Sequence, residues 1–250
     1  AIADSPDEVR TRVREQLMRG APQITLTAGG GVSSPHSPLD AVTFTPAELR
    51  AATEAAGNWG TYVTVHAYTP EAVRQAIAAG VKVIEHGSLM DDETIWLSIQ
   101  PFPDELADAF PPGSVERQKA DEVFAGNDHA YDLAKKYGLK TAWGTDVLFS
   151  RALATRQGAI LASLTRWYTP AETLVMATGT NGELLQLTGK RNPYPGKIGV
   201  VQEGALADLL LVNGDPVADI SLIANPERGL AVIMKDGVIY KDLAAPPATH

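Results

Sequence analysis

Cysteine is absent from this 250-residue chain, which excludes disulfide bonds and thiolate metal ligands. Long apolar runs are also missing, so the sequence predicts no membrane-spanning helix. Basic residues are in the minority, since 21 lysines and arginines face 30 aspartates and glutamates, for a net charge of −9. This balance argues against a basic surface for nucleic acid or anionic lipid, and it favours a small-molecule partner.

The chain begins at Ala1 without an initiator methionine or a signal-like apolar stretch. We therefore expect a fragment or a processed product, with the missing part supplied by an amino-terminal segment or by another chain. A homo-oligomer is a further alternative. Apolar residues make up 44% of the sequence, which is enough for one α/β domain, or for a large domain with an appendage.

Short β-branched runs alternate with helical segments in the first third of the chain. The runs at 61–66 and 81–86 both end in a histidine. A helix is expected at 6–18, and two more begin after Thr45 and Thr69, where a threonine N-cap precedes a proline. A strand, a helix and a strand within about twenty residues form the shortest right-handed crossover, so we expect neighbouring parallel strands.

The middle of the chain is less regular. A strand at 96–102 would follow the previous one too closely for a full crossover, which normally needs about a dozen residues, so the helix there is rudimentary or residues are missing. Beyond it we expect a helix at 116–137 with a break near Gly126, a strand at 141–146, and helices at 151–167 and 170–187.

The composition changes again near residue 198. Three short apolar runs follow, at 198–204, 207–212 and 231–240. Turn signals made of Gly, Asn-Gly and Asp-Gly lie within or between them. Such closely spaced turns are typical of a small antiparallel sheet and not of another strand and helix pair.

Three residues able to bind a metal stand where predicted strands end, namely His66, His86 and Asp146. The carboxyl ends of the strands carry the active site in a (β/α) barrel. Neutral imidazoles bind zinc at about 2.0–2.1 Å, and a catalytic zinc lowers the pKa of water to roughly 7 and polarises a carbonyl. A carboxylate such as Asp146 can accept the proton of that water and pass it to a leaving amine. The sequence therefore predicts part of a hydrolytic metal site, although a single strand-end histidine is more often structural.

The order of these motifs resembles the carboxyl-terminal two-thirds of a metal-dependent amidohydrolase, over nearly the whole chain. The likeness is strongest to the imidazolonepropionase-related and prolidase-like (Xaa-Pro dipeptidase-like) branch, through His66-Ala-Tyr68-Thr-Pro, Gly144-Thr-Asp146 and the stretch 191–208. The resemblance implies an α/β fold, a distorted (β/α)8 TIM-type barrel with one or two divalent metals, usually zinc, beside a β-sandwich. Residues 1–190 would supply barrel strands four to eight, and residues 191–250 would supply part of the sandwich.

The resemblance also suggests a role for Tyr68, and the other residues are interpreted from their own positions in the sequence. Tyr68 would hold a substrate carboxylate or carbonyl, with packing against a loop as the alternative. His36 is interpreted as a solvated loop residue, and His129 and His250 as surface residues. The glycines at 29–31 lack the spacing of a phosphate-binding loop and are interpreted as a tight barrel turn.

Two features depart from the family pattern. No His-x-His motif occurs, so half of the expected metal site is missing. Thr25 stands where relatives carry a lysine that becomes carboxylated and bridges two metals, and no lysine precedes Lys82. A threonine hydroxyl is a weak, uncharged ligand and cannot replace a bridging carbamate.

The prediction is a metal-dependent hydrolase that cleaves the amide of a dipeptide or an N-acyl amino acid, with this chain alone inactive. Opening of a cyclic amide and hydrolysis of an ester or phosphotriester are alternatives, because one metal site serves all of them. A decayed, non-catalytic barrel that acts as a subunit or binding module is an alternative of another class. An upstream segment with His-x-His would favour the enzyme, and a genuine start at Ala1 would favour the decayed barrel.

Overall fold

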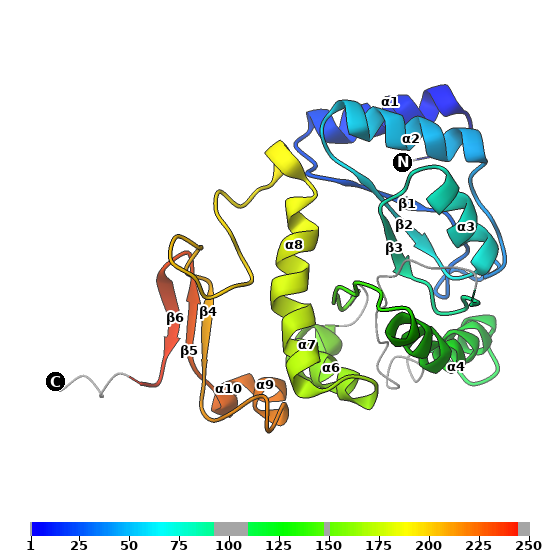
Figure 1. The fold of residues 1–250 in the computed structure, drawn as a ribbon. Helices are drawn as coiled ribbons and strands as arrows, with labels where there is room; N and C mark the ends of the chain where they lie inside the picture. Colours follow the sequence, from blue (N-terminus) through cyan, green and yellow to red (C-terminus); the bar gives the residue numbers. More distant parts are fainter. Residues whose placement is uncertain (1, 93–109, 148–150, 245–250) are drawn as a thin grey trace. The chain divides into compact units, whose positions relative to one another are not determined.

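The computed structural model describes residues 2–92, 110–147 and 151–244 (Figure 1). The chain forms two compact units, one of Ala1–Ala142 with Leu185–Pro193 and one of Trp143–Leu184 with Tyr194–His250. The division predicted at residue 190 concerns the barrel and the sandwich of a complete fold, and it stays a prediction. Among the described residues, no helix is both long enough and apolar enough to cross a membrane.

The first unit contains a three-stranded parallel sheet in the order β1-β2-β3. The strands are β1 (Ile24–Thr27), β2 (Val63–Ala67) and β3 (Val83–His86), and the connecting helices are α2 (Pro46–Asn58) and α3 (Pro70–Ala78). Both helices pack against β2, whose Val63 and Val65 are almost fully buried. The predicted parallel crossovers are therefore confirmed for this part of the chain.

Local signals set the ends of these helices. Before α2, the Thr45 hydroxyl accepts a hydrogen bond from the Glu48 backbone N–H, and the Glu48 carboxylate accepts one from the Thr45 N–H. This capping box satisfies two backbone donors that the first turn leaves open. After α3, Gly80 has a φ of +89°, which only glycine adopts without strain, and the chain turns there into β3.

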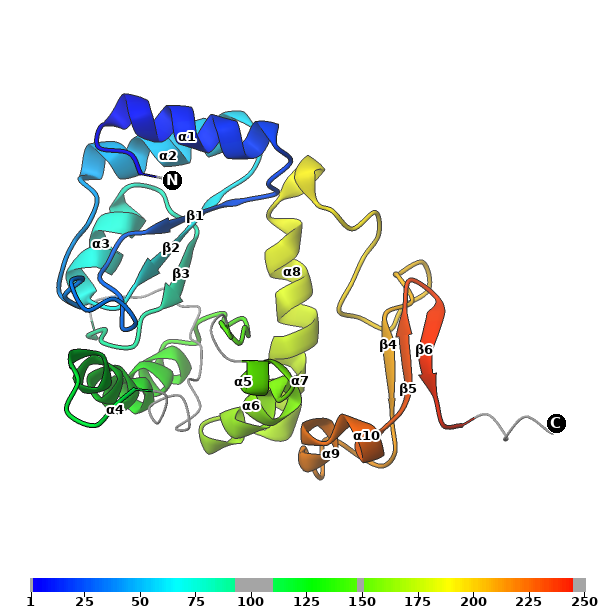
Figure 2. The ribbon, with the colours of Figure 1, turned by 180° about the vertical axis from the view of Figure 1, so that it is seen from behind.

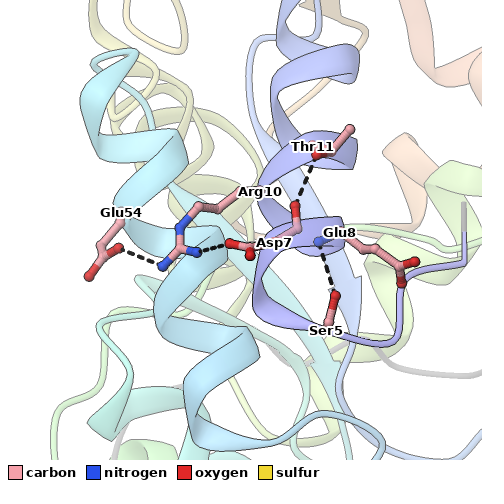
Figure 3. Close-up of polar contacts among 6 residues, drawn as sticks. All are labelled: Ser5, Asp7, Glu8, Arg10, Thr11 and Glu54. Atoms are coloured by element: carbon pink, nitrogen blue, oxygen red, sulfur yellow. Dashed lines mark hydrogen bonds and ion pairs between the residues drawn. The ribbon is translucent and has the colours of Figure 1, made fainter.

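Helix α1 (Pro6–Met18) lies beside α2 in both views (Figure 1 and Figure 2). Its apolar stripe Val9, Val13 and Leu17 is buried. Arg10 lies between Asp7 of its own helix, at 2.7 Å, and Glu54 of α2, at 3.6 Å (Figure 3). Exposed ion pairs of this kind contribute at most about 1 kcal/mol, so the buried stripe holds the two helices together.

Helix α4 (Val115–Lys136) corrects the prediction of a break near Gly126, because the helix continues through that residue. A Cβ atom at Gly126 would lie 2.1 Å from the carbonyl oxygen of Ser88. The glycine therefore allows a close approach between α4 and the segment that follows β3. The strand predicted at 96–102 lies outside the described residues.

The strand predicted at 141–146 is not found, since residues 141–147 form no paired strand in the described structure. A strand is defined by backbone hydrogen bonds to a neighbour, and no described segment forms a ladder with these residues. The apolar run is present, but its pattern alone does not create a partner.

Helices begin the second unit. The helix predicted at 151–167 is divided into three pieces. Arg156 separates the first two because it leaves the helical conformation with φ −112° and ψ 21°, and the last piece is a 3-10 turn that follows directly. The helix predicted at 170–187 is continuous but contains a π-helical turn. The elements are α5 (Arg151–Ala154), α6 (Gln157–Ser163), η2 (Leu164–Arg166), α7 (Pro170–Val175), the π turn η3 (Met176–Thr180) and α8 (Asn181–Gln186). The last two residues of α8, and η4 (Gly189–Arg191), belong to the first unit.

An antiparallel sheet completes the second unit, as predicted. It consists of β4 (Leu209–Val212), β5 (Leu230–Lys235) and β6 (Val238–Asp242), in that order. Asp236 and Gly237 join the last two strands with φ values of +50° and +74°, as a tight hairpin turn requires. Two short helices, α9 (Ser221–Ala224) and α10 (Pro226–Gly229), precede β5.

The prediction of a strand at 198–204 is wrong, because these residues form no strand. Only an isolated bridge between Lys197 and Ala205 flanks this segment. Its backbone lies against the helical region instead, where a Cβ atom at Gly182 would be 2.5 Å from the Ile198 oxygen and one at Gly199 would be 2.2 Å from the Thr178 oxygen. Gly182 and Gly199 therefore serve close backbone packing.

Candidate active site

Two of the predicted metal ligands lie together at the carboxyl end of the parallel sheet. His66 is the fourth residue of β2, His86 is the last residue of β3, and the strand register pairs His86 with Ala67. The two imidazole rings are 4.5 Å apart between centroids, with an interplanar angle of 76°. The order of strands thus places both side chains at the carboxyl end of the sheet, as the sequence predicted.

His86 is held in an environment that favours its neutral form. Its side chain is buried, and its backbone has a φ of +79°, a conformation that residues other than glycine rarely adopt. Burial, and secondarily the nearby His66, lowers the pKa of His86 from 6.5 to about 3. A metal binds only the unprotonated imidazole, so His86 is ready to act as a ligand at neutral pH.

His66 has one ring nitrogen that is already engaged. Its Nε2 atom lies 2.8 Å from the carbonyl oxygen of Gly30. A carbonyl can only accept a hydrogen bond, so Nε2 carries a proton, and in the neutral imidazole the lone pair is then on Nδ1. A backbone carbonyl that fixes the tautomer in this way is a common partner of metal-binding histidines. The geometry therefore selects Nδ1 of His66 as the nitrogen available to a metal.

Tyr68 packs against both histidines. Its ring lies 5.0 Å from that of His86 in a stacked arrangement and 4.9 Å from that of His66 in an edge arrangement. The side chain is only 2% exposed and belongs to a cluster with Leu39 and Val123. The structure thus places Tyr68 beside the two histidines, and its predicted role in binding substrate stays a prediction.

Asp146 belongs to the other compact unit, so the structure does not bring it together with the histidines within one unit. Its side chain is exposed and its φ is +45°. Within the described ranges, no group of three or more histidine, aspartate or glutamate side chains is arranged to hold a metal ion. The described residues supply two candidate ligands and do not complete a metal site.

The remaining sequence candidates lie apart from this pair. His36 and His129 are exposed, and His250 lies outside the described residues. The tight turn predicted at 29–31 is not found, since Gly29 forms an isolated bridge with Val42. Gly30 instead allows a close backbone approach, because a Cβ atom there would lie 1.6 Å from the Pro38 oxygen. Thr25 is exposed, and its register with Thr64 places it on the sheet face that also carries His66.

The comparisons with known proteins decide the family. The sequence pattern described as the amidohydrolase family matches residues 1–239. The chain belongs to the amidohydrolase family. The resemblance predicted from the sequence is thereby confirmed, and with it the TIM-barrel type of fold. The amidohydrolase family is generally metal-dependent. The numbering of the barrel strands, the sandwich and the likeness to imidazolonepropionase stay predictions.

Individual relatives show which amidohydrolases are similar to this one. Ochratoxinase from Aspergillus niger is 28% identical over 257 residues, which cover 96% of this chain and 50% of the relative. A crystal structure of an amidohydrolase has a TM-score of 0.87 at 33% identity, over 98% of this chain and 60% of that one. A prolidase complexed with N-methylphosphonate-L-proline has a TM-score of 0.85 at 28% identity, over 96% and 59%. The chain spans about half the length of the curated relatives it matches.

Sequence reasoning missed two residues of this amidohydrolase, one beside His66 in the sheet and one that contacts the loop next to it. Glu85 is the register partner of His66, and its carboxylate accepts a hydrogen bond from the Thr64 hydroxyl. Alternation along β3 could have placed Glu85 on the face that carries His66. Lys119 of α4 contacts the loop after β1, and no sequence signal connects the two segments.

The low pKa of His86 predicts how acid affects the metal-free chain. The unfolded chain protonates His86 below about pH 6.5, but the folded chain resists protonation until about pH 3. The stabilising contribution is therefore complete above pH 6.5 and is lost as the pH falls through this window, with a slope of at most about 1.4 kcal/mol per pH unit.

Urea denaturation between pH 7 and pH 4 measures this effect. We expect the free energy of unfolding to fall less steeply with acid in His86→Gln than in the unmodified chain. His129→Gln removes an exposed histidine and serves as the control. Equal slopes for His86→Gln and the unmodified chain would show that His86 is not held neutral.

Proposed function

We propose that this amidohydrolase takes part in hydrolysing the amide bond of a dipeptide or an N-acyl amino acid, with a divalent metal that we propose to be zinc. The observation that carries the proposal is the pair His66 and His86, with rings 4.5 Å apart at the ends of neighbouring parallel strands. The similar structures include a prolidase with a proline phosphonate and a Xaa-Pro dipeptidase, which supports a small amide substrate.

The chain's own residues suit the proposed ligand role. His86 is kept neutral by burial, and His66 presents Nδ1 because Nε2 donates to Gly30. Such a metal would supply Lewis acidity toward the substrate carbonyl. The described residues provide only these two ligands, so the remaining ligands have to come from outside them. Position 25 carries threonine instead of the bridging lysine, which favours a site for one metal.

Two further residues are assigned roles in this proposal. Asp146 would accept a proton from the attacking water and deliver it to the leaving amine, because a carboxylate can perform both transfers. Tyr68 would hold a carboxylate or carbonyl of the substrate, and its position beside both histidine rings supports this role.

A substrate panel tests the proposed reaction. The 250-residue chain and the product of the complete gene are each incubated with zinc and with Xaa-Pro dipeptides, N-acyl amino acids, a cyclic amide, an ester and a phosphotriester. We expect the complete product to release amine from the first two classes. Preference for another class would change the substrate assignment, and inactivity of the complete product on every class would favour a non-catalytic binding module.

Metal binding provides a separate prediction for the 250-residue chain. With two imidazoles and no complete ligand set in its described part, the chain is expected to bind at most one divalent ion, and weakly. Isothermal titration calorimetry with zinc should show this single weak site, and His66→Ala or His86→Ala should abolish it. His129→Ala is the matched control. Two metals per chain that survive dialysis would contradict the prediction.

A further inference from the structure

The loop that follows β1 is held by a lysine far away in the sequence. Lys119 lies in the second turn of α4 and is only 9% exposed. Its Nζ atom donates to the carbonyl oxygens of Gly31 at 3.3 Å, Ser34 at 2.7 Å and Ser37 at 2.6 Å. An ammonium group has three N–H donors, so each of them has a backbone acceptor here.

The three carbonyls replace the water that a buried ammonium group loses. A buried charge is unfavourable unless hydrogen bonds compensate for it, and Lys119 forms no ion pair with any described residue. Conversely, the three carbonyl dipoles converge on one point because a cation is there. Without the ammonium group, these oxygens would repel one another and would turn toward solvent. Lys119 therefore fixes the shape of the segment 31–37.

This segment is joined directly to the histidine pair. The carbonyl of Gly31 contacts Lys119, and the carbonyl of the preceding Gly30 accepts the hydrogen bond from Nε2 of His66. Helix α4 also contacts the far end of the same loop, where its Val123 packs with Leu39 and with Tyr68. One helix thus holds the loop at both ends.

We propose that Lys119 is a positioning residue for His66. By holding 31–37, it keeps the Gly30 carbonyl on Nε2 of His66, which fixes the proton there and leaves Nδ1 for a ligand. The importance of Nδ1 rests on the proposed function, but the control of the tautomer by Lys119 does not, since it is a property of the metal-free chain.

Nitrogen NMR of the metal-free chain, labelled at histidine, measures the tautomer directly. We expect a fixed Nε2–H tautomer for His66 in the unmodified chain. Lys119→Met keeps the length of the side chain but removes the charge, and it should give an averaged mixture of tautomers. Lys135→Met, an exposed position on the same helix, should leave the tautomer unchanged. Zinc affinity should fall by about 10- to 100-fold in Lys119→Met, as for other residues that orient a ligand.

Rescue by a small amine separates positioning from general stability. Lys119→Ala leaves space for propylammonium, which should restore the fixed tautomer, whereas the uncharged propanol should not. A folded Lys119→Met chain that keeps the Nε2–H tautomer would overturn the proposal. If Lys119→Met does not fold, Lys119→Ala provides the test. An averaged tautomer of His66 at saturating propylammonium, or a Lys119→Ala chain that stays unfolded, would also overturn the proposal. If the complete gene product binds no zinc while the 250-residue chain shows the expected tautomers, the proposed function alone is refuted.

Discussion

Replacement of Asp146 by asparagine is expected to lower kcat of the complete hydrolase, meaning the protein with every metal ligand, by at least about 10²-fold. Asparagine keeps the size of the side chain but loses its charge and basicity, so it cannot accept a proton from water or return one to the leaving amine. Fold stability should change little, because Asp146 is exposed. Steady-state kinetics on an amide substrate, together with thermal unfolding, measure both quantities.

Asp215→Asn is the matched control for this experiment. Asp215 is also exposed and lies in the same compact unit, and its carboxylate accepts a hydrogen bond from the Val217 backbone, which an amide oxygen can also accept. This variant should keep normal turnover. If Asp146→Asn folds normally and also keeps near-normal turnover, Asp146 has no part in the proton transfer.

Lysine at position 25 is expected to raise the metal content of the complete hydrolase from one ion to two. Thr25 is paired with Thr64 of β2, so its side chain lies on the same sheet face as His66. A lysine placed between two cations favours deprotonation, and the neutral amine can then capture carbon dioxide to form a bridging carbamate. The second metal should therefore bind only when bicarbonate is present during loading.

Metal titration of Thr25→Lys with and without bicarbonate tests this expectation. Thr11→Lys introduces the same change at an exposed position of α1 and should leave the stoichiometry unchanged. The alternative is that Thr25 is simply a residue that favours β-structure, in which case a lysine there would only disturb packing. An unchanged stoichiometry of Thr25→Lys in both conditions would remove position 25 from the metal site.

Features predicted correctly from the sequence depend on nearby residues. The start of α2 follows from a threonine, a proline and a glutamate within four positions, whose hydrogen bonds are all local. The turn between β5 and β6 follows from Asp236 and Gly237, which tolerate positive φ. The placement of His66 and His86 at one sheet edge follows from two short crossover units, because parallel strands joined in this way lie side by side.

Features predicted wrongly depend on distant partners. The runs at 141–146 and 198–204 have the composition of strands, but a strand needs a hydrogen-bonded neighbour, and none is present in the described structure. Gly126 was expected to break a helix, yet its missing side chain admits the Ser88 carbonyl. A glycine in the sequence does not say whether it serves a turn or a close contact.

By itself, then, the sequence determined the helix starts, the parallel crossovers, the family and the identity of the two histidines, because short-range capping, alternation and motif order encode them. Only the tertiary structure decided that His86 is buried and neutral, that Nε2 of His66 donates to Gly30, and that Lys119 holds the intervening loop. Lys119 lies 82 to 88 residues from the carbonyls it contacts. The pKa of a side chain and the tautomer of an imidazole depend on which atoms surround it, and at such separations only the folded chain brings those atoms together.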